Sequence, residues 1–179
     1  MKKSILLTLL FAVLLLLSCE EDAPEVVDPR EAIAGNYEMN VLTGGTFDSD
    51  FNVQSSPIIE VSYEDSFDDD EIYLDLEAFV EAILEELTLM QFNTRDILRA
   101  QISRDELLAT VEGDLIELED VEFLTLYTSA VNEDDILVCE LNLSGKIDGS
   151  AISFDFDLYA IGENISYYAE GSTSGSAIQ

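Results

Sequence analysis

Carboxylates are the most abundant reactive groups in this chain of 179 residues, which contains 39 acidic and seven basic residues. Asp155 and Asp157 share one face of a predicted strand, and two carboxylates at a defined separation can hydrolyse a glycosidic bond. Neighbouring acids arise by chance in so acidic a chain, however, and histidine is absent. A serine or cysteine nucleophile therefore has no imidazole base. We predict no catalytic residues, with a carboxylate- or calcium-dependent extracellular hydrolase as the alternative.

Calcium is the one metal that the sequence suits, because this ion prefers oxygen ligands from acidic loops. Segment 65–71 offers such ligands in the carboxylates of Asp65, Asp68, Asp69 and Asp70. The segment does not follow the EF-hand pattern, with its central glycine and terminal glutamate. Zinc would need histidine or a cysteine cluster, and the chain has no histidine and two separated cysteines. We expect no cofactor, with calcium at this loop as the weak alternative.

The elements that position these groups are predicted to be mainly strands. Apolar and polar residues alternate over 36–41 and again over 57–63, which is typical of half-buried strands. Strand patterns return between residues 115 and 170, where Asp148-Gly149 is a two-residue hairpin signal. Short sequential connections favour an antiparallel meander or a closed β-barrel of about eight strands. The alternative is an open α+β sheet with helices on one face.

A helical insertion is predicted over about residues 77–111. Apolar residues from Leu76 to Met90 recur at the spacing of an amphipathic helix. A second helix is predicted from Thr94, with a capping box at residues 103–106. In a later strand Leu124 and Leu126 make the opposite face apolar as well, which predicts that the helices cover the outside of the sheet.

Residues 1–18 have the organisation of a signal peptide. Two lysines precede an apolar run over residues 5–17, which is shorter than the roughly 20 residues of a membrane span. Leu16 and Ser18 stand before Cys19, and this arrangement resembles the lipobox of bacterial lipoproteins. The resemblance implies cleavage between Ser18 and Cys19 and lipidation of Cys19. Two or more acyl chains would anchor the protein firmly to a membrane.

An acidic tether is predicted after the lipidated cysteine, over residues 19–31. The run Glu20-Glu21-Asp22 resembles the surface-export signal of lipoproteins from the Bacteroidetes. The resemblance implies an outer-membrane protein whose domain, residues 32–179, faces the medium. Loss of the leader leaves five basic residues against 39 acidic ones. Nucleic acid and anionic lipid surfaces are therefore unsuitable partners, because both reward positive charge.

Aromatic residues are expected to face one interior. Gly35-Asn36-Tyr37 behind a helical turn, with a closing hairpin over residues 146–158, resembles lipocalin-like (calycin-like) lipoproteins, although that family usually has tryptophan where Tyr37 stands. The resemblance implies a barrel. Its aromatics would form the core or line a pocket for a small apolar ligand. These aromatic residues are Tyr37, Tyr63, Phe154, Phe156 and Tyr167.

Three of the few basic residues lie in the predicted helical insertion, namely Arg95, Arg99 and Arg104. They either pair with the row of helix glutamates or form a docking patch for a partner. Cys139 lies on an apolar strand face and is predicted to be a small buried thiol. We predict a lipid-anchored envelope lipoprotein that acts as a non-catalytic binding or scaffold module. The alternative is a structural subunit of an outer-membrane complex.

Overall fold

The computed structural model describes residues 28–46, 48–63, 70–92, 97–103, 107–128, 135–163 and 165–178. The helices and strands, in chain order, are η1 (Pro29–Ala32), β1 (Gly35–Gly45), β2 (Asp50–Asn52), β3 (Ile58–Ser62), β4 (Glu71–Asp75), α2 (Glu77–Phe92), β5 (Ile97–Gln101), β6 (Leu108–Glu112), β7 (Leu115–Thr128), β8 (Asp135–Asp148), β9 (Ala151–Ile161) and β10 (Ser166–Ala177).

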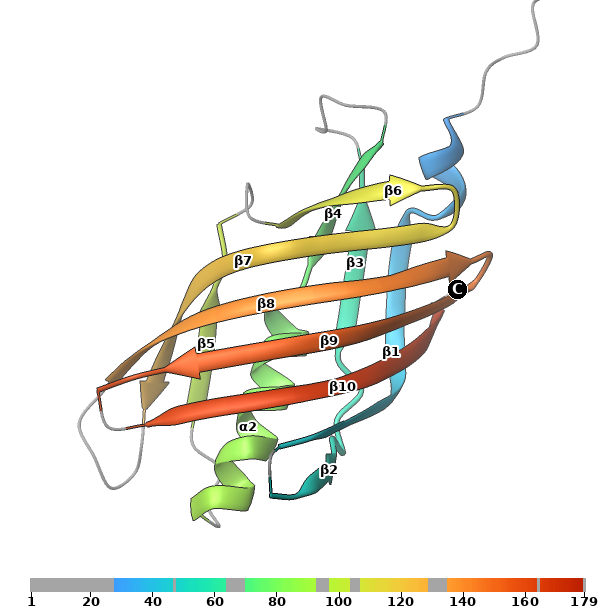
Figure 1. Ribbon diagram of the computed structural model, residues 1–179. Coiled ribbons are helices and arrows are strands. Elements are labelled where there is room, and N and C mark those ends of the chain that lie inside the picture. Colours follow the sequence, from blue (N-terminus) through green and yellow to red (C-terminus); the bar gives the residue numbers. More distant parts are fainter. Residues whose placement is uncertain are drawn as a thin grey trace, which may run out of the picture.

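Eight antiparallel strands form a closed barrel, in the order β10-β9-β8-β7-β6-β4-β3-β1 (Figure 1). Pairing of β10 with β1, from Tyr37↔Ala177 to Gly45↔Glu170, closes the barrel. Strands β2 and β5 lie outside this path and pair with β1 and β7. The prediction of a mainly β, closed, eight-stranded barrel is confirmed, and the open α+β sheet is wrong.

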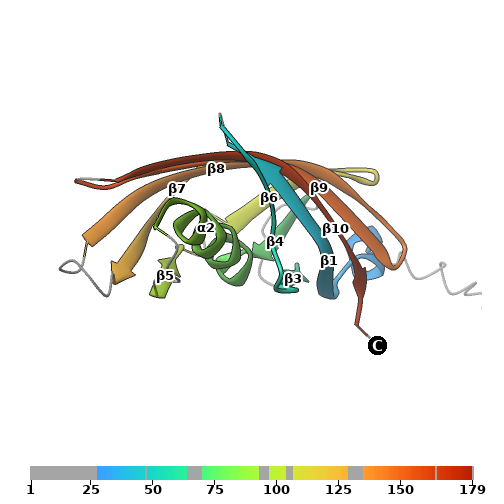
Figure 2. The same cartoon turned by 90° about the horizontal axis from the view of Figure 1, so that it is seen from below.

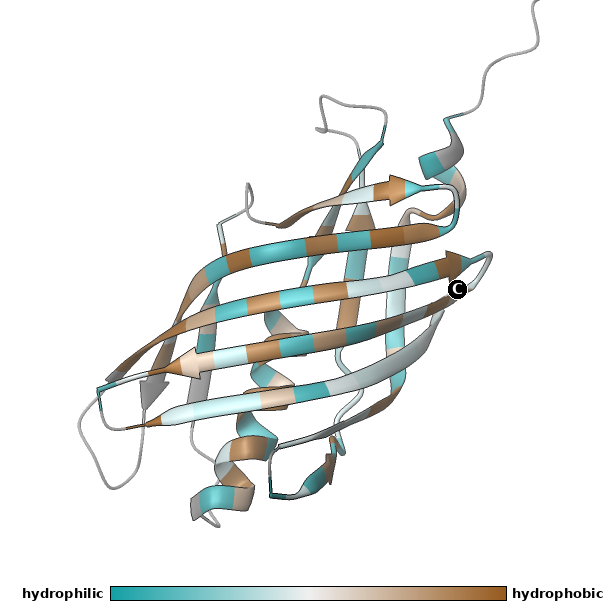
Figure 3. Cartoon of the chain, in the orientation of Figure 1, coloured by the Kyte–Doolittle hydropathy of each residue, from teal (hydrophilic) through white to brown (hydrophobic). Residues whose placement is uncertain are grey.

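The residues that fill the barrel interior are set by the alternation of buried and exposed side chains along each strand. In β9, Phe154 and Phe156 are buried while Asp155 and Asp157 are exposed. Figure 3 shows the same alternation of hydrophilic and hydrophobic colours along β7, β8 and β9. Successive side chains of a strand point to opposite faces, so each strand contributes every second residue to the core. The tight turn between β8 and β9 has Gly149 at φ 59°, as the hairpin signal predicted.

Helix α2 packs against the inner face of the sheet, under the arch formed by β7 to β10 (Figure 2). The ring of Phe79 meets that of Phe156 edge-on, with centroids 5.5 Å apart. The prediction that helices cover the outer face is therefore wrong. An inner position suits α2 because its apolar residues span more than one stripe, with Ala82, Ile83 and Leu84 all buried.

The second predicted helix is also wrong, because residues 97–101 form β5 and residues 108–112 form β6. β6 reaches only the first part of β7, so β5 can pair with the remainder of its edge. In β5 Arg99 is exposed and Ala100 is buried, which is the period of a strand. Glu81 of α2 caps the other edge of β5. Its carboxylate accepts from the Ala100 amide at 3.0 Å and from the Arg99 guanidinium at 3.2 Å.

The described part of the chain opens with the short helix η1, which the sequence predicted as one helical turn behind Asp28. The Asp28 side chain accepts a hydrogen bond from the Arg30 amide and caps η1. The Arg30 guanidinium donates to Asp28 at 2.6 Å and to the Glu71 carbonyl at 3.0 Å, and it lies 5.2 Å from the centre of the Tyr63 ring. Hydrogen bonds from Arg30 lower the pKa of Asp28 below its usual value. The contacts with Glu71 and Tyr63 fix η1 to the barrel.

Candidate functional site

The outer face of β7, β8 and β9 carries a set of large apolar side chains that are exposed to solvent. We call this set the outer apolar patch. Each member is between 42% and 60% exposed, which is far from the near-complete burial of the barrel core. The patch consists of Leu124, Leu126, Ile136, Val138, Tyr159 and Ile161.

Strand register makes the outer apolar patch continuous. Val138 stands at its centre, opposite Leu124 of β7 and Ile161 of β9. Leu126 pairs with Ile136 in the next row of the same face. Directly opposed side chains in a sheet are in contact. Tyr159 precedes Ile161 by two positions on the exposed face of β9. The six residues therefore form one surface and are not isolated exposures.

The size of the outer apolar patch indicates a binding surface. The exposed fractions of its members give an area on the order of 600 Å², at the upper end of what monomeric proteins expose. Exposure of this area to water costs free energy at about 25 cal/mol per Å². Other large apolar residues of the strands are exposed singly: Val41, Ile58 and Leu115 stand opposite Ser174, Glu38 and Lys146. The patch differs because its members stand opposite one another. Coverage by another molecule would remove the cost of its exposure.

Carboxylates occupy the adjoining part of the same face, and we call them the acidic belt. Glu122 stands opposite Glu140, and Asp157 stands opposite Glu170, so two like-charge pairs face each other directly. Such pairs destabilise a sheet slightly. The belt consists of Glu117, Glu119, Glu122, Glu140, Asp155, Asp157 and Glu170, all exposed.

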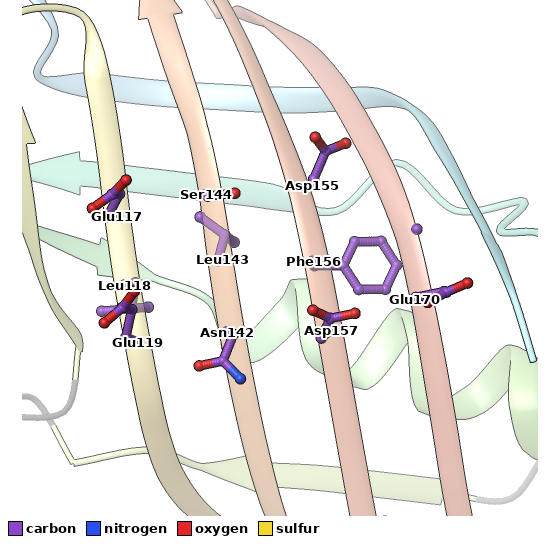
Figure 4. Close-up of a pocket in the computed structure, with 11 residues that line it drawn as sticks. Glu117, Leu118, Glu119, Asn142, Leu143, Ser144, Asp155, Phe156, Asp157 and Glu170 are labelled. Carbon is purple, nitrogen blue, oxygen red and sulfur yellow. The ribbon is translucent and has the colours of Figure 1, made fainter.

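A β-bulge shapes the centre of the acidic belt. The β7–β8 register shifts between Leu118 and Val121. Asp120 adopts φ 55°, and its amide donates to the Asn142 side chain at 2.7 Å. A shallow depression of about 440 Å³ lies beside the bulge (Figure 4). Its carboxylates come from β7, β9 and β10, and they spread across the sheet rather than converge on one point.

Tyrosines join the patch to the belt. The rings of Tyr159 and Tyr168 lie 4.7 Å apart between centroids, and the Tyr168 hydroxyl donates to Glu170 at 2.8 Å. This hydrogen bond raises the pKa of Tyr168. The boundary between the two surfaces is thus built from amphipathic side chains, which are typical of protein interfaces.

Four of the five predicted interior aromatics lie in the core, and Tyr63 packs against it half-buried. The Tyr37 hydroxyl donates to the Ile33 carbonyl at 2.8 Å, and burial raises the pKa of Tyr37. The Tyr167 hydroxyl lies 3.4 Å from that of Thr88 on α2. Phe154 and Phe156 are buried side chains of β9. Helix α2 thus packs among these aromatics within the barrel.

The other predicted site residues are scattered or lie outside the described residues. Arg99 is paired with Glu81, while Arg95 and Arg104 are not among the described residues. Of the calcium candidates only Asp70 is described, as an exposed turn residue, and Asp65, Asp68 and Asp69 fall outside. The described residues contain no group of three metal-ligating side chains.

The predicted processing site lies outside the described residues as well, with both Ser18 and Cys19 in the undescribed first 27 residues. None of the helices that the structure describes has the length and apolarity to cross a membrane.

Cys139 is fully buried beside Thr125, which confirms the prediction of a buried thiol. Burial raises the pKa of Cys139 to about 11. Because the unfolded chain loses this proton at lower pH, the stability that burial of the neutral thiol provides should be lost as pH rises from about 9 to 11. At pH 8 the folded protein should react with a thiol reagent at least roughly a hundredfold more slowly than the urea-unfolded protein. Similar rates in the two states would contradict the burial.

Comparison of the chain with known protein families, with curated proteins and with solved structures finds no match. The fold and the outer face of β7 to β10 therefore carry the functional argument.

Proposed function

We propose that this chain is a lipid-anchored protein of the cell envelope that acts as a non-catalytic binding or scaffold module. The outer apolar patch carries the proposal. It presents six large side chains around Val138 on a rigid, closed barrel, and rigid elements hold a binding surface more accurately than loops. The partner is a protein that covers this patch, as in a subunit of an outer-membrane complex.

The envelope location rests on the leader. An apolar run over residues 5–17 ends in Leu16-Leu17-Ser18-Cys19, and the resemblance to a lipobox supports lipidation of Cys19. The acidic residues that follow support a position on the outer membrane facing the medium. A tether between Cys19 and Asp28 would leave the barrel free to meet a partner near the membrane.

A small apolar ligand is the second candidate. A depression of about 400 Å³ lies at the end of α2, lined by Leu87, Met90 and Tyr167 among others. Tyr167 is one of the aromatics predicted to form either the core or the lining of a pocket. Leu87 and Met90 would contact the apolar part of such a ligand, and the polar residues of the lining, such as Thr46 and Ser166, would orient it.

Catalysis is less well supported. The carboxylates of the acidic belt are exposed on the outer face of a sheet, whereas hydrolytic pairs flank a substrate at a defined separation. Figure 4 shows Glu117, Asp155 and Glu170 on three separate strands. Asp157 and Glu170, like Glu122 and Glu140, stand directly opposite each other on neighbouring strands.

The proposal is tested in cells that carry a photo-crosslinking amino acid at position 138 and grow with labelled palmitate. We expect the protein to carry the label, to fractionate with membranes and to form one discrete protein adduct. The same crosslinker at Ser174, an exposed residue of β10 outside the patch, should form no adduct. Cys19→Ser should lose the label, the membrane fraction and the adduct together.

Two results would contradict the proposal. An unchanged label on Cys19→Ser would refute the lipid anchor. Equal adducts from positions 138 and 174, or none from position 138, would refute the outer apolar patch as the docking surface.

A further inference from the structure

We propose that the occupant of the outer apolar patch is a segment of a partner protein whose apolar face is bordered by lysine or arginine residues. This inference rests on the proposed function and adds the chemistry of the partner. The patch by itself would accept any apolar surface. The charges that border it therefore decide between occupants. On the β5 side Arg99 stands opposite Leu126, but its guanidinium pairs with Glu81, so the acids on the other side set the sign of the border.

The acidic belt begins in the row of the sheet next to the patch. Glu122 and Glu140 are the outer-face residues that precede Leu124 and follow Val138 along their strands, and the two glutamates stand directly opposite each other. Like charges in such positions repel. A cation beside them would remove the repulsion. The partner should therefore carry a basic group at the edge of its apolar face.

Negative charge continues in the rows beyond Glu122 and Glu140. One row further, Asp157 stands opposite Glu170, and Asp155 follows in the row after that. Lys146 is the only basic residue in the described parts of β7 to β10. It pairs with Leu115 and Ser153 beyond the belt, so no basic side chain of these strands lies within the rows of the two opposed pairs.

A second copy of this chain and an anionic membrane are less suitable occupants. The chain has a net charge of −32, so two copies repel each other at long range before their patches can meet. Anionic lipid headgroups would be repelled in the same way. A cationic partner is attracted from a distance and gains apolar contact when it docks.

The combined area suits a specific complex. The patch supplies on the order of 600 Å² of apolar surface, and a standard interface buries roughly 800 Å² on each partner. Glu122 and Glu140, in the adjoining row, supply the polar rim. An apolar centre with a charged rim is the usual anatomy of such interfaces.

The test uses the full chain in nanodiscs of a neutral lipid and two synthetic amphipathic peptides as probes. Both peptides have the same leucine face, which is flanked by lysines in one peptide and by glutamates in the other. Fluorescence anisotropy should show that the lysine peptide binds at least about tenfold more tightly than the glutamate peptide. The affinity of the lysine peptide should fall when the salt concentration is raised.

Three variants locate the binding. Val138→Ser should weaken binding of the lysine peptide at least about tenfold. Glu122→Gln combined with Glu140→Gln should weaken this binding about fivefold. The matched control is Glu60→Gln combined with Asp75→Asn, because these exposed acids also stand directly opposite each other, on β3 and β4. The control removes the same charge and should leave binding unchanged.

The outcomes separate this inference from the proposed function. If both peptides bind equally well and Val138→Ser abolishes the binding of both, the basic partner is refuted while the docking surface stands. If the control pair weakens binding as much as the pair beside the patch, general charge attraction is responsible and the inference is overturned. Self-association through Val138 in sedimentation would also overturn it, in favour of a second copy. Failure of the crosslinks at position 138 would refute the proposed function itself.

Discussion

Replacement of Phe79 by alanine should lower the free energy of unfolding by about 3–5 kcal/mol, because the change leaves a large cavity between α2 and the barrel. Phe79 is fully buried and meets Phe156 edge-on at 5.5 Å. The cavity cannot close easily, since Phe156 belongs to a strand that is paired on both sides. Urea denaturation of the purified protein measures the change.

Helix α2 has little stability of its own to offset this loss. Glu77, Glu81 and Glu85 stand four residues apart, and each such like-charge pair costs a few tenths of a kcal/mol. The last turn contains no basic residue to interact with the helix dipole. Phe79→Ala should therefore also reduce the helical signal in far-UV circular dichroism before the sheet unfolds.

Met90→Ala is the matched control on the same helix. Met90 is 39% exposed, so its removal should cost less than about 1 kcal/mol. If the two variants were equally stable, α2 would not be anchored inside the barrel by Phe79.

The helix and most strands could be predicted from the sequence because their apolar residues repeat with a clear period. The run from Leu76 to Met90 predicted α2, and the alternation beside Asp155 predicted β9. β5 could not be predicted in the same way. Its five residues are too few to distinguish the period of a strand from that of a helix, and its pairing with a distant part of β7 decides the outcome.

The outer apolar patch had a signal in the sequence that pointed to the wrong cause. Leu124 and Leu126 made both faces of β7 apolar, which predicted covering helices. The structure places α2 on the inner face instead. Ile136 and Val138 repeat the pattern on the next strand, so the same rule, followed across β8, would have identified a contiguous outer surface.

The closure of the barrel was the least predictable feature, because the closing half of β10 has few apolar residues. The sequence predicted a strand up to Glu170 and left the tail after Gly171 as either a short strand end or a frayed end. In the structure β10 continues to Ala177 and pairs with β1 from Glu170 onward. Small residues are needed there because the two backbones approach closely. Gly175, for example, has no room for a side chain beside the Glu38 carbonyl.

Gly171→Ala tests this closure and should lower the free energy of unfolding by about 1–3 kcal/mol or more. Gly171 stands opposite Gly44 of β1. A β-carbon at this position would lie 2.2 Å from the Thr43 carbonyl oxygen and 2.6 Å from the Gly44 α-carbon. Both contacts are with backbone, which cannot move without separating β10 from β1. A lower urea midpoint and faster amide exchange along the β1–β10 pairing are expected.

Gly45→Ala provides the control one residue along the same seam. An added β-carbon there would meet the Asp50 side-chain oxygen at 3.2 Å, and that flexible carboxylate can turn away. Its cost should stay below about 1 kcal/mol, although Gly45 pairs with Glu170 in the same ladder as Gly171. If Gly171→Ala were as stable as Gly45→Ala, β10 would not approach β1 closely enough to close the barrel. The outer apolar patch would then belong to an open sheet free to flatten, and its rigidity would no longer support a docking surface.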